Sequence, residues 1–141
     1  MKVEFQLLSS GGENERIDKA CALAEHAWRK GERVWLAVGD NAQAQYIDEA
    51  LWTFREDSFV PHERVTDAAH AETPVLVALH QQLKQLPQGV VINLSAEPVG
   101  ICDAVSRVVE VLAASDVARA EGRTRYRQYR DAGCELETVH V

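Results

Sequence analysis

Arg33-Val-Trp-Leu-Ala-Val38, followed directly by Gly39-Asp-Asn41, is the stretch that decides the fold. A short apolar run that ends at a turn is typical of a strand buried on both faces of a sheet. Segments with helical spacing of apolar residues flank it at 17–28 and 44–51, and a strand-like run opens the chain at 3–8. The order strand, helix, strand, helix predicts a βαβ unit and therefore a parallel sheet.

The rest of the chain continues this alternation. Further strands are expected at 74–79, at 89–94 near the centre of the sheet, and at 134–141 along an edge. The valines of 107–112 favour a strand there, although the segment could also continue a short helix expected at 102–105. Asn14 and either Ser115 or Asp116 are expected to cap helices. Together these elements predict one three-layer α/β domain over residues 1–141, with a mainly parallel central sheet.

Composition restricts the class of protein. The chain has 141 residues, with 22 acidic and 15 basic side chains and a formal net charge of −7, which argues against broad binding to duplex phosphates. Cys21, Cys102 and Cys134 lie far apart without CxxC spacing, and indicate the reduced thiols of a cytoplasmic protein. Neither an N-terminal signal nor a membrane-spanning apolar run is found, so we expect no membrane association.

The stretch Arg119–Arg130 carries the clearest functional signal. Its twelve positions hold five of the fifteen basic residues and two of the three tyrosines, with Glu121 as the only acid. On a helix, four side chains fall within about 60° of one another, with Arg127 beside them: Arg119, Arg123, Tyr126 and Arg130. A neighbouring stripe is expected to pack against the sheet: Ala118, Gly122, Tyr129 and Ala132. Arginine-rich helix faces are often simply solvated or paired with nearby acids, and this interpretation stays open. Arginine forks also suit carboxylates or phosphates, so the alternative is a ligand, which could be an acidic peptide or a single-stranded nucleic acid.

No pattern in the sequence indicates an enzyme. Ser9–Arg16 follows the first strand, where a phosphate loop would lie, but it matches neither GxGxxG nor GxxxxGK[ST]. The five histidines show no HExxH spacing, and no cysteine has an apparent base. We therefore expect no catalytic residue, no metal and no cofactor, and a nucleotide-dependent enzyme remains the weakest alternative.

A second candidate surface lies in the connection at 53–73, which has no periodicity. Trp52 and the run Phe59-Val-Pro61 are large apolar groups beside polar chain. Such groups are usually buried as plugs of the core, and residue chemistry alone slightly favours that interpretation here. They can also form an exposed patch for a partner protein.

Several segments, taken together, resemble the chi subunit of bacterial DNA polymerase III. They follow the same order as in that family: Trp28-Arg-Lys-Gly-Glu-Arg-Val34, Asp48-Glu-Ala-Leu-Trp52, Ser58-Phe-Val-Pro-His62 and Arg123-Thr-Arg-Tyr-Arg-Gln-Tyr-Arg-Asp-Ala-Gly133. The resemblance is collinear over essentially the whole chain, and residues 63–88 and the last five contribute little to it.

The resemblance implies a non-enzymatic clamp-loader accessory subunit, with a nucleotide-binding-like α/β fold that has no nucleotide site. Such proteins bind the acidic C-terminal tail of single-stranded-DNA-binding protein (SSB), and so contact single-stranded DNA indirectly. On a separate surface they bind the psi subunit, and some bind a repair helicase there.

The site residues that the resemblance implies fall into two groups. For the SSB tail, Arg123 would hold the terminal carboxylate, Arg119 and Arg127 would attract upstream aspartates, and Tyr126 and Leu112 would line the pocket for the terminal apolar side chain. Arginines 119 and 127 stand where the family has lysine. For psi or the helicase, the residues would be Trp52, Phe59 and Pro61. Direct binding of single-stranded nucleic acid through the Arg/Tyr helix remains the alternative.

Overall fold

The computed structural model describes residues 1–65, 73–85, 88–100 and 103–141. The strands are β1 (Lys2–Leu7), β2 (Val34–Val38), β3 (His62–Arg64), β4 (Val75–Leu79), β5 (Gly89–Asn93), β6 (Val105–Leu112) and β7 (Glu135–His140). The helices are α1 (Glu13–Arg29), α2 (Asn41–Thr53), a short 3-10 helix η1 (His80–Gln85) and α3 (Asp116–Asp131). None of these helices is long and apolar enough to cross a lipid bilayer.

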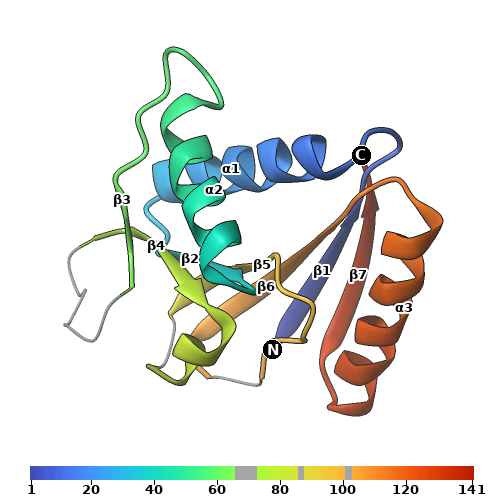
Figure 1. The fold of residues 1–141 in the computed structure, drawn as a ribbon. Helices are drawn as coiled ribbons and strands as arrows, with labels where there is room; N and C mark the ends of the chain where they lie inside the picture. Colours follow the sequence, from blue (N-terminus) through green and yellow to red (C-terminus); the bar gives the residue numbers. More distant parts are fainter. Residues whose placement is uncertain (66–72, 86–87, 101–102) are drawn as a thin grey trace.

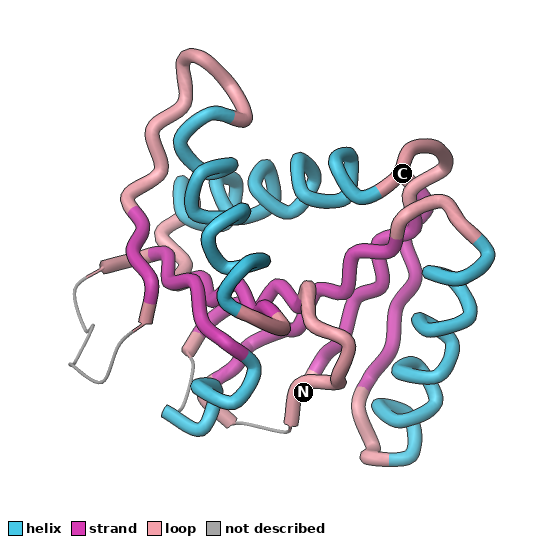
Figure 2. Tube along the Cα trace, in the orientation of Figure 1, coloured by secondary structure: helices cyan, strands magenta, loops and turns pink. Residues whose placement is uncertain are grey.

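The strands form one seven-stranded sheet in the order β3-β4-β2-β5-β6-β1-β7, and each of its pairings is parallel (Figures 1 and 2). The predicted α/β class with a parallel sheet is therefore confirmed. β5 is the central strand and β7 is an edge strand, as expected from the apolar run at 89–94 and the alternating run at the C-terminus.

Each face of the sheet has its own core, because neighbouring side chains of a strand point to opposite faces. Val34, Leu36 and Val38 of β2 pack with α1 and α2, whereas Trp35 and Ala37 belong to the core that includes Tyr129 of α3. The helices therefore lie on both faces, which confirms the three-layer arrangement.

The helix ends follow local capping chemistry. Asp40 caps α2 by accepting from the Gln43 N–H at 2.8 Å, and Ser115 caps α3 by accepting from the Ala118 N–H at 3.1 Å. The expectation for Asn14 is wrong, because α1 begins at Glu13 and the Asn14 side chain accepts a hydrogen bond from the Tyr46 hydroxyl instead. At this end Glu15 Oε2 accepts from the Gly12 N–H at 2.8 Å.

Two further expectations need correction. Of the helix expected at 102–105, Cys102 lies outside the described residues, Asp103 and Ala104 form a turn, and Val105 opens β6. The strand at 107–112 is confirmed. The connection at 53–73 contains β3, which three polar residues form without any alternation that the sequence could have signalled.

Candidate functional site

A pocket of about 290 Å³ opens beside α3 and is called the α3 pocket below. Its lining residues are Phe5, Leu7, Leu112, Arg119, Gly122, Arg123, Tyr126 and Thr138. Four of the five residues expected at the basic helix site therefore meet around one pocket, although they come from two elements. The fifth, Arg127, is exposed and does not line it.

Close packing of α3 on the end of β6 shapes this pocket. Gly122 is buried, and a Cβ there would collide with the side chain of Leu112. The aromatic wall consists of Phe5, which is 2% exposed, and Tyr126, whose ring centroid lies 5.4 Å from that of Phe5. An apolar floor with arginines at its rim can hold a group that is apolar and anionic at once.

The five arginines of α3 have different environments. Arg123 makes no hydrogen bond or ion pair within the part of the chain that the structure describes. Arg119 donates from Nη2 to the Leu8 carbonyl at 3.3 Å, and Arg127 reaches only the Thr124 hydroxyl, at 3.4 Å. Arg130 pairs with its neighbour Asp131 at 3.4 Å. Arg123 is thus the guanidinium at the pocket with its donors free for a ligand.

The fifth arginine, Arg125, belongs to a buried network beneath the helix. Its Nε donates at 3.1 Å to Oε1 of Glu110, a carboxylate of β6 that is fully buried. Oε2 of Glu110 accepts from the Tyr129 hydroxyl and from Asn93 Nδ2, both at 2.7 Å. Three donors thus satisfy the buried carboxylate, and two of them fix α3 against the sheet.

Tyr129 extends this network to the loop after β5. Its hydroxyl accepts from the Val99 N–H at 2.8 Å while it donates to Glu110. Burial raises the pKa of the Tyr129 hydroxyl, and the nearby Glu110 carboxylate raises it further, so the hydroxyl keeps its proton. The orientation of α3, and with it the α3 pocket, therefore depends on side chains buried beneath the helix.

Sequence reasoning missed Glu110 and the role of Arg125. A signal was available for Arg125, which falls on the packing stripe with Gly122 and Tyr129 rather than on the arginine face. Gly122 and Tyr129 are buried as expected, but Ala132, assigned to the same stripe, is exposed at the helix end. For Glu110, an acid within an apolar strand was the only available indication.

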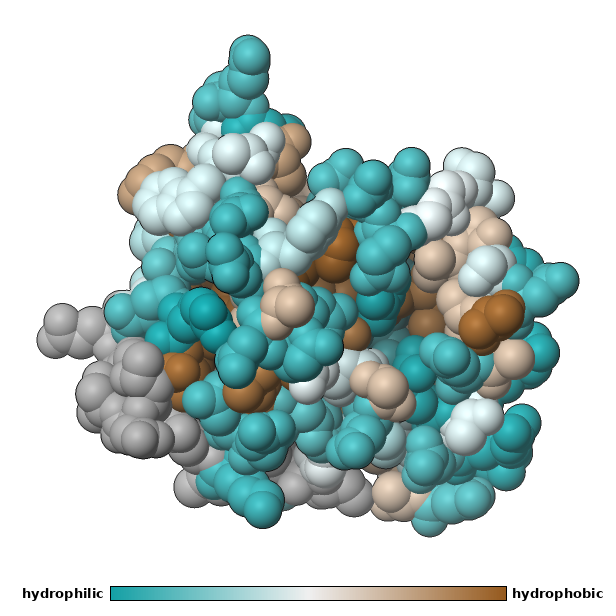
Figure 3. Space-filling model, viewed as in Figure 1, coloured by the Kyte–Doolittle hydropathy of each residue, from teal (hydrophilic) through white to brown (hydrophobic). Residues whose placement is uncertain are grey.

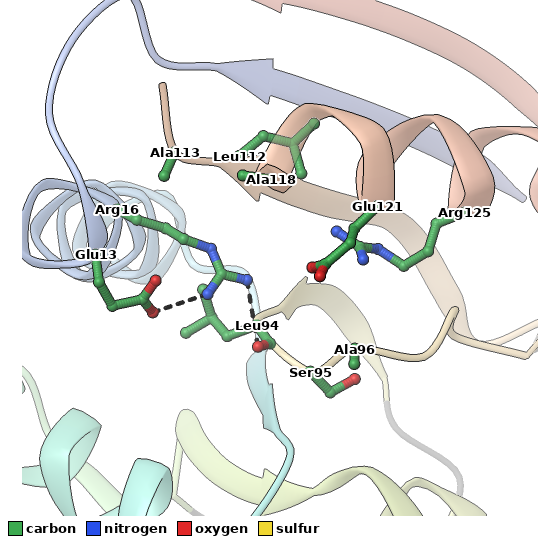
Figure 4. A pocket seen from close by; sticks show the side chains of 10 residues that line it. All are labelled: Glu13, Arg16, Leu94, Ser95, Ala96, Leu112, Ala113, Ala118, Glu121 and Arg125. Carbon is green, nitrogen blue, oxygen red and sulfur yellow. Dashed lines mark hydrogen bonds and ion pairs between the residues drawn. The ribbon is translucent and has the colours of Figure 1, made fainter. Parts of the chain in front are cut away.

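A second, smaller pocket of about 160 Å³ lies where the carboxyl ends of β5 and β6 meet α1 and α3 (Figure 4). Arg16 reaches into it from α1 and donates to the Val111 carbonyl at 2.7 Å and to the Leu94 carbonyl at 3.2 Å. Glu13 pairs with the same guanidinium at 2.9 Å. This edge of a parallel sheet is where α/β proteins often bind ligands, and here Arg16 links α1 to β6 and to the residue that follows β5.

The second expected surface lies at the opposite end of the sheet, where α2 leads into β3. Trp52 and Phe59 are 50% and 60% exposed, and their ring centroids are 5.3 Å apart. Pro61, two positions after Phe59, is half-buried. We call Trp52, Phe59 and Pro61 the loop surface. Figure 3 shows the tip of this loop at the top as hydrophilic, with paler and brown groups directly below it.

Within 59–61, only Val60 is the core plug that the apolar run suggested. Val60 is fully buried in the core beneath α1 and α2, while its neighbour Phe59 points outward. Trp52, the other candidate for a buried apolar group, also faces solvent. Its ring lies 4.7 Å from that of His62, whose side chain is fully buried.

A pair of groups suited to acid-base chemistry lies beside the loop surface, where His62 is 3.2 Å from Asp48. Within the described ranges, no three His, Cys, Asp or Glu side chains are placed to hold a metal ion. Burial raises the pKa of the Cys21 thiol to about 12, so this cysteine stays protonated at neutral pH and is a poor nucleophile.

Comparison with known proteins identifies the family of the chain. Residues 1–137 match the family described as "DNA polymerase III chi subunit, HolC". A DNA polymerase III subunit chi from Pseudomonas aeruginosa is 35% identical over 96% of this chain and 94% of the relative. The protein of that name from Escherichia coli K12 is 34% identical, over 84% of this chain and 81% of the relative.

A comparison of structures shows the fold independently. The chain resembles part of the crystal structure of T4 UvsW, with a TM-score of 0.69 and 10% sequence identity. The match covers 99% of this chain and 41% of the other chain. At so low an identity it shows a shared fold alone. The match over residues 1–137 and the two relatives show that this chain belongs to the DNA polymerase III chi subunit family.

Proposed function

We propose that the protein is a non-catalytic, cytoplasmic adaptor of the DNA polymerase III clamp-loader complex and supports DNA replication. It binds the acidic C-terminal tail of SSB in the α3 pocket and the psi subunit on the loop surface. The observation that carries the proposal is the α3 pocket itself. There the guanidinium of Arg123, which has no partner among the described residues, stands beside an apolar cavity of about 290 Å³.

This pocket suits a chain end that combines an apolar side chain with a free carboxylate. Arg123 can form a two-pronged hydrogen bond with the carboxylate, the pairing that guanidinium geometry favours. Leu112, Phe5 and Tyr126 can cover the apolar side chain. Arg119 lies at the same rim, and Arg127 is exposed farther along the helix, where each can attract acidic residues upstream in the tail.

Charge distribution supports an acidic peptide over a nucleic acid. Five arginines and one glutamate lie in Arg119–Arg130, whereas the whole chain has a net charge of −7. A short acidic tail can bind at the positive helix alone, whereas an extended polyanion is disfavoured by the net negative charge of the chain as a whole. Tyr126 packs against Phe5, which limits its use as a platform for stacked bases.

The loop surface supports the second half of the proposal. Two large aromatic rings that are half or more exposed, and that contact each other, are characteristic of a protein interface. This surface lies beside β3, at the sheet edge opposite β7 and α3, so both partners can bind at the same time (Figure 1). A repair helicase is a second candidate partner for the loop surface.

Calorimetry with a synthetic SSB tail peptide tests the first half of the proposal. We expect the peptide with a free C-terminus to bind and the same peptide with an amidated C-terminus to bind more than tenfold more weakly, because removing one charge from a hydrogen-bonded pair that is buried in the complex costs about 2–5 kcal/mol. Equal affinities would contradict the proposed role of Arg123. A labelled oligonucleotide that binds tightly, with no binding of the peptide, would favour direct nucleic-acid binding instead.

A further inference from the structure

Glu25 lies in α1, far in sequence from both proposed surfaces, and its carboxylate is buried. The residue is 4% exposed, and its side chain is directed at the loop that follows α2. Glu25 Oε1 pairs with Arg55, and Oε2 accepts a hydrogen bond from the Ser58 hydroxyl. Arg29, one turn further along α1, is 3.8 Å away.

A buried carboxylate is costly unless donors surround it. Among the described residues, three side chains pair or hydrogen-bond with Glu25, and two of them come from the loop: Arg55, four positions before Phe59, and Ser58, directly before it. Other conformations of the loop would leave the carboxylate with Arg29 alone, at the edge of ion-pair distance. Glu25 therefore favours this loop conformation over its alternatives.

Anchors on both sides of Phe59 explain why an irregular segment can display an aromatic ring in a defined place. On the N-terminal side, Glu25 holds Arg55 and Ser58. On the C-terminal side, Val60 is buried in the core, and the His62 ring lies against Trp52 and 3.2 Å from Asp48. Phe59 remains 60% exposed between these contacts.

We infer that Glu25 is a positioning residue for the loop surface, acting through Arg55 and Ser58 to hold Phe59 beside Trp52. This inference rests on the proposed function of the loop surface as the psi-binding site, but the anchor itself can be tested without a partner. When the loop already holds Phe59 in place, binding does not have to order the loop, and the entropy cost of binding the partner is lower.

Amide hydrogen exchange tests the anchor. In the full-length Glu25→Gln variant we expect amides of residues 55–59 to exchange about tenfold faster, because the loop opens locally more often. The sheet amides should keep their protection. Glu13→Gln is the matched control, since it makes the same change on the same helix at a side chain that is 61% exposed, and it should leave the loop unchanged.

Binding measurements test the consequence for the partner. If the competent conformation falls to about one tenth of the population, psi binds Glu25→Gln about tenfold more weakly, while affinity for the SSB tail peptide is unchanged. Arg55→Gln should also weaken psi binding. The double variant Glu25→Gln/Arg55→Gln should be weakened by less than the product of the two single effects, because both side chains act through one contact.

The outcomes separate this inference from the proposed function. Unchanged exchange at 55–59 in Glu25→Gln would overturn the inference, as would faster exchange throughout the sheet with weaker tail binding, which is the result for a purely structural residue. Failure of the parent protein to bind psi would overturn the proposed partner alone, and the exchange experiment would still decide the role of Glu25.

Discussion

The α3 pocket and the loop surface are both backed by a buried glutamate paired with an arginine, but the two pairs differ in their surroundings. Glu110 has three donors, and its partner Arg125 has a side chain only 6% exposed. Glu25 is nearly as buried, yet its partner Arg55 is 54% exposed and lies on an irregular loop. The helix that forms the α3 pocket is thus held by a pair inside the core, whereas the loop surface is held by a pair at the margin of the core.

The largest expected effect tests whether the Glu110–Arg125 pair beneath α3 is part of the core. Glu110→Ala leaves Arg125 buried without its counter-charge and should lower the free energy of unfolding by about 3–5 kcal/mol. Denaturant unfolding measures this loss. Glu137→Ala is the control, since Glu137 pairs with Lys2 at the surface with both side chains about half exposed, and it should change stability little. A similar loss in both variants would show that the buried Glu110–Arg125 pair matters no more to stability than a surface ion pair.

The next effect concerns binding at the loop surface. Phe59→Ala removes the more exposed ring and should weaken psi binding by about 2 kcal/mol, as expected for an aromatic residue that contributes strongly to an interface. Because Phe59 is 60% exposed, the melting temperature should hardly change. Val117→Ala, which shortens an apolar side chain 69% exposed on α3, is the control and should bind psi like the parent. Equal psi affinity in Phe59→Ala would remove this residue from the interface.

Gly122→Ala tests whether the α3 pocket is as tightly built as its packing indicates. An added Cβ must displace the buried Leu112 side chain or lift α3, and either change should weaken binding of the tail peptide by about 1 kcal/mol. Stability should change less than the overpacking alone would suggest, because alanine is the better helix former. Unchanged peptide affinity by calorimetry would show that Leu112 can move without affecting the pocket.

The smallest effect is expected at the rim. Arg127 is exposed and outside the pocket lining, so Arg127→Ala should weaken tail-peptide binding by only about 0.2–1 kcal/mol. The loss should shrink as salt is added, because exposed charges are screened within about 10 Å at 0.1 M salt. Titrations at two salt concentrations check this. A large loss that does not depend on salt would place Arg127 inside the site.

Much of this structure could be predicted from local patterns in the sequence. The apolar run at 89–94 and the valines of 107–112 identified buried strands, and the arginine face of 119–130 identified the rim of the α3 pocket. These features depend on periodicity, which a sequence displays directly. β3 was missed because three polar residues have no period, and it pairs only with β4.

The contacts that hold the two surfaces in place were beyond such patterns. Glu110 and Arg125 lie 15 positions apart, and Ser58 lies 33 positions from Glu25. Neither pairing follows from helical or strand spacing. Likewise, nothing in the run 59–61 distinguishes the buried Val60 from the exposed Phe59, since both are apolar and the difference arises from how the loop is anchored.

The most direct test of the central claim, two separate binding surfaces on one adaptor, is calorimetry of Arg123→Ala with the SSB tail peptide and with psi. We expect the tail peptide to bind more than tenfold more weakly and psi to bind as it does to the parent, with the fold intact by circular dichroism. Tail binding equal to that of the parent would contradict the account. So would a parallel loss of both partners in a folded protein.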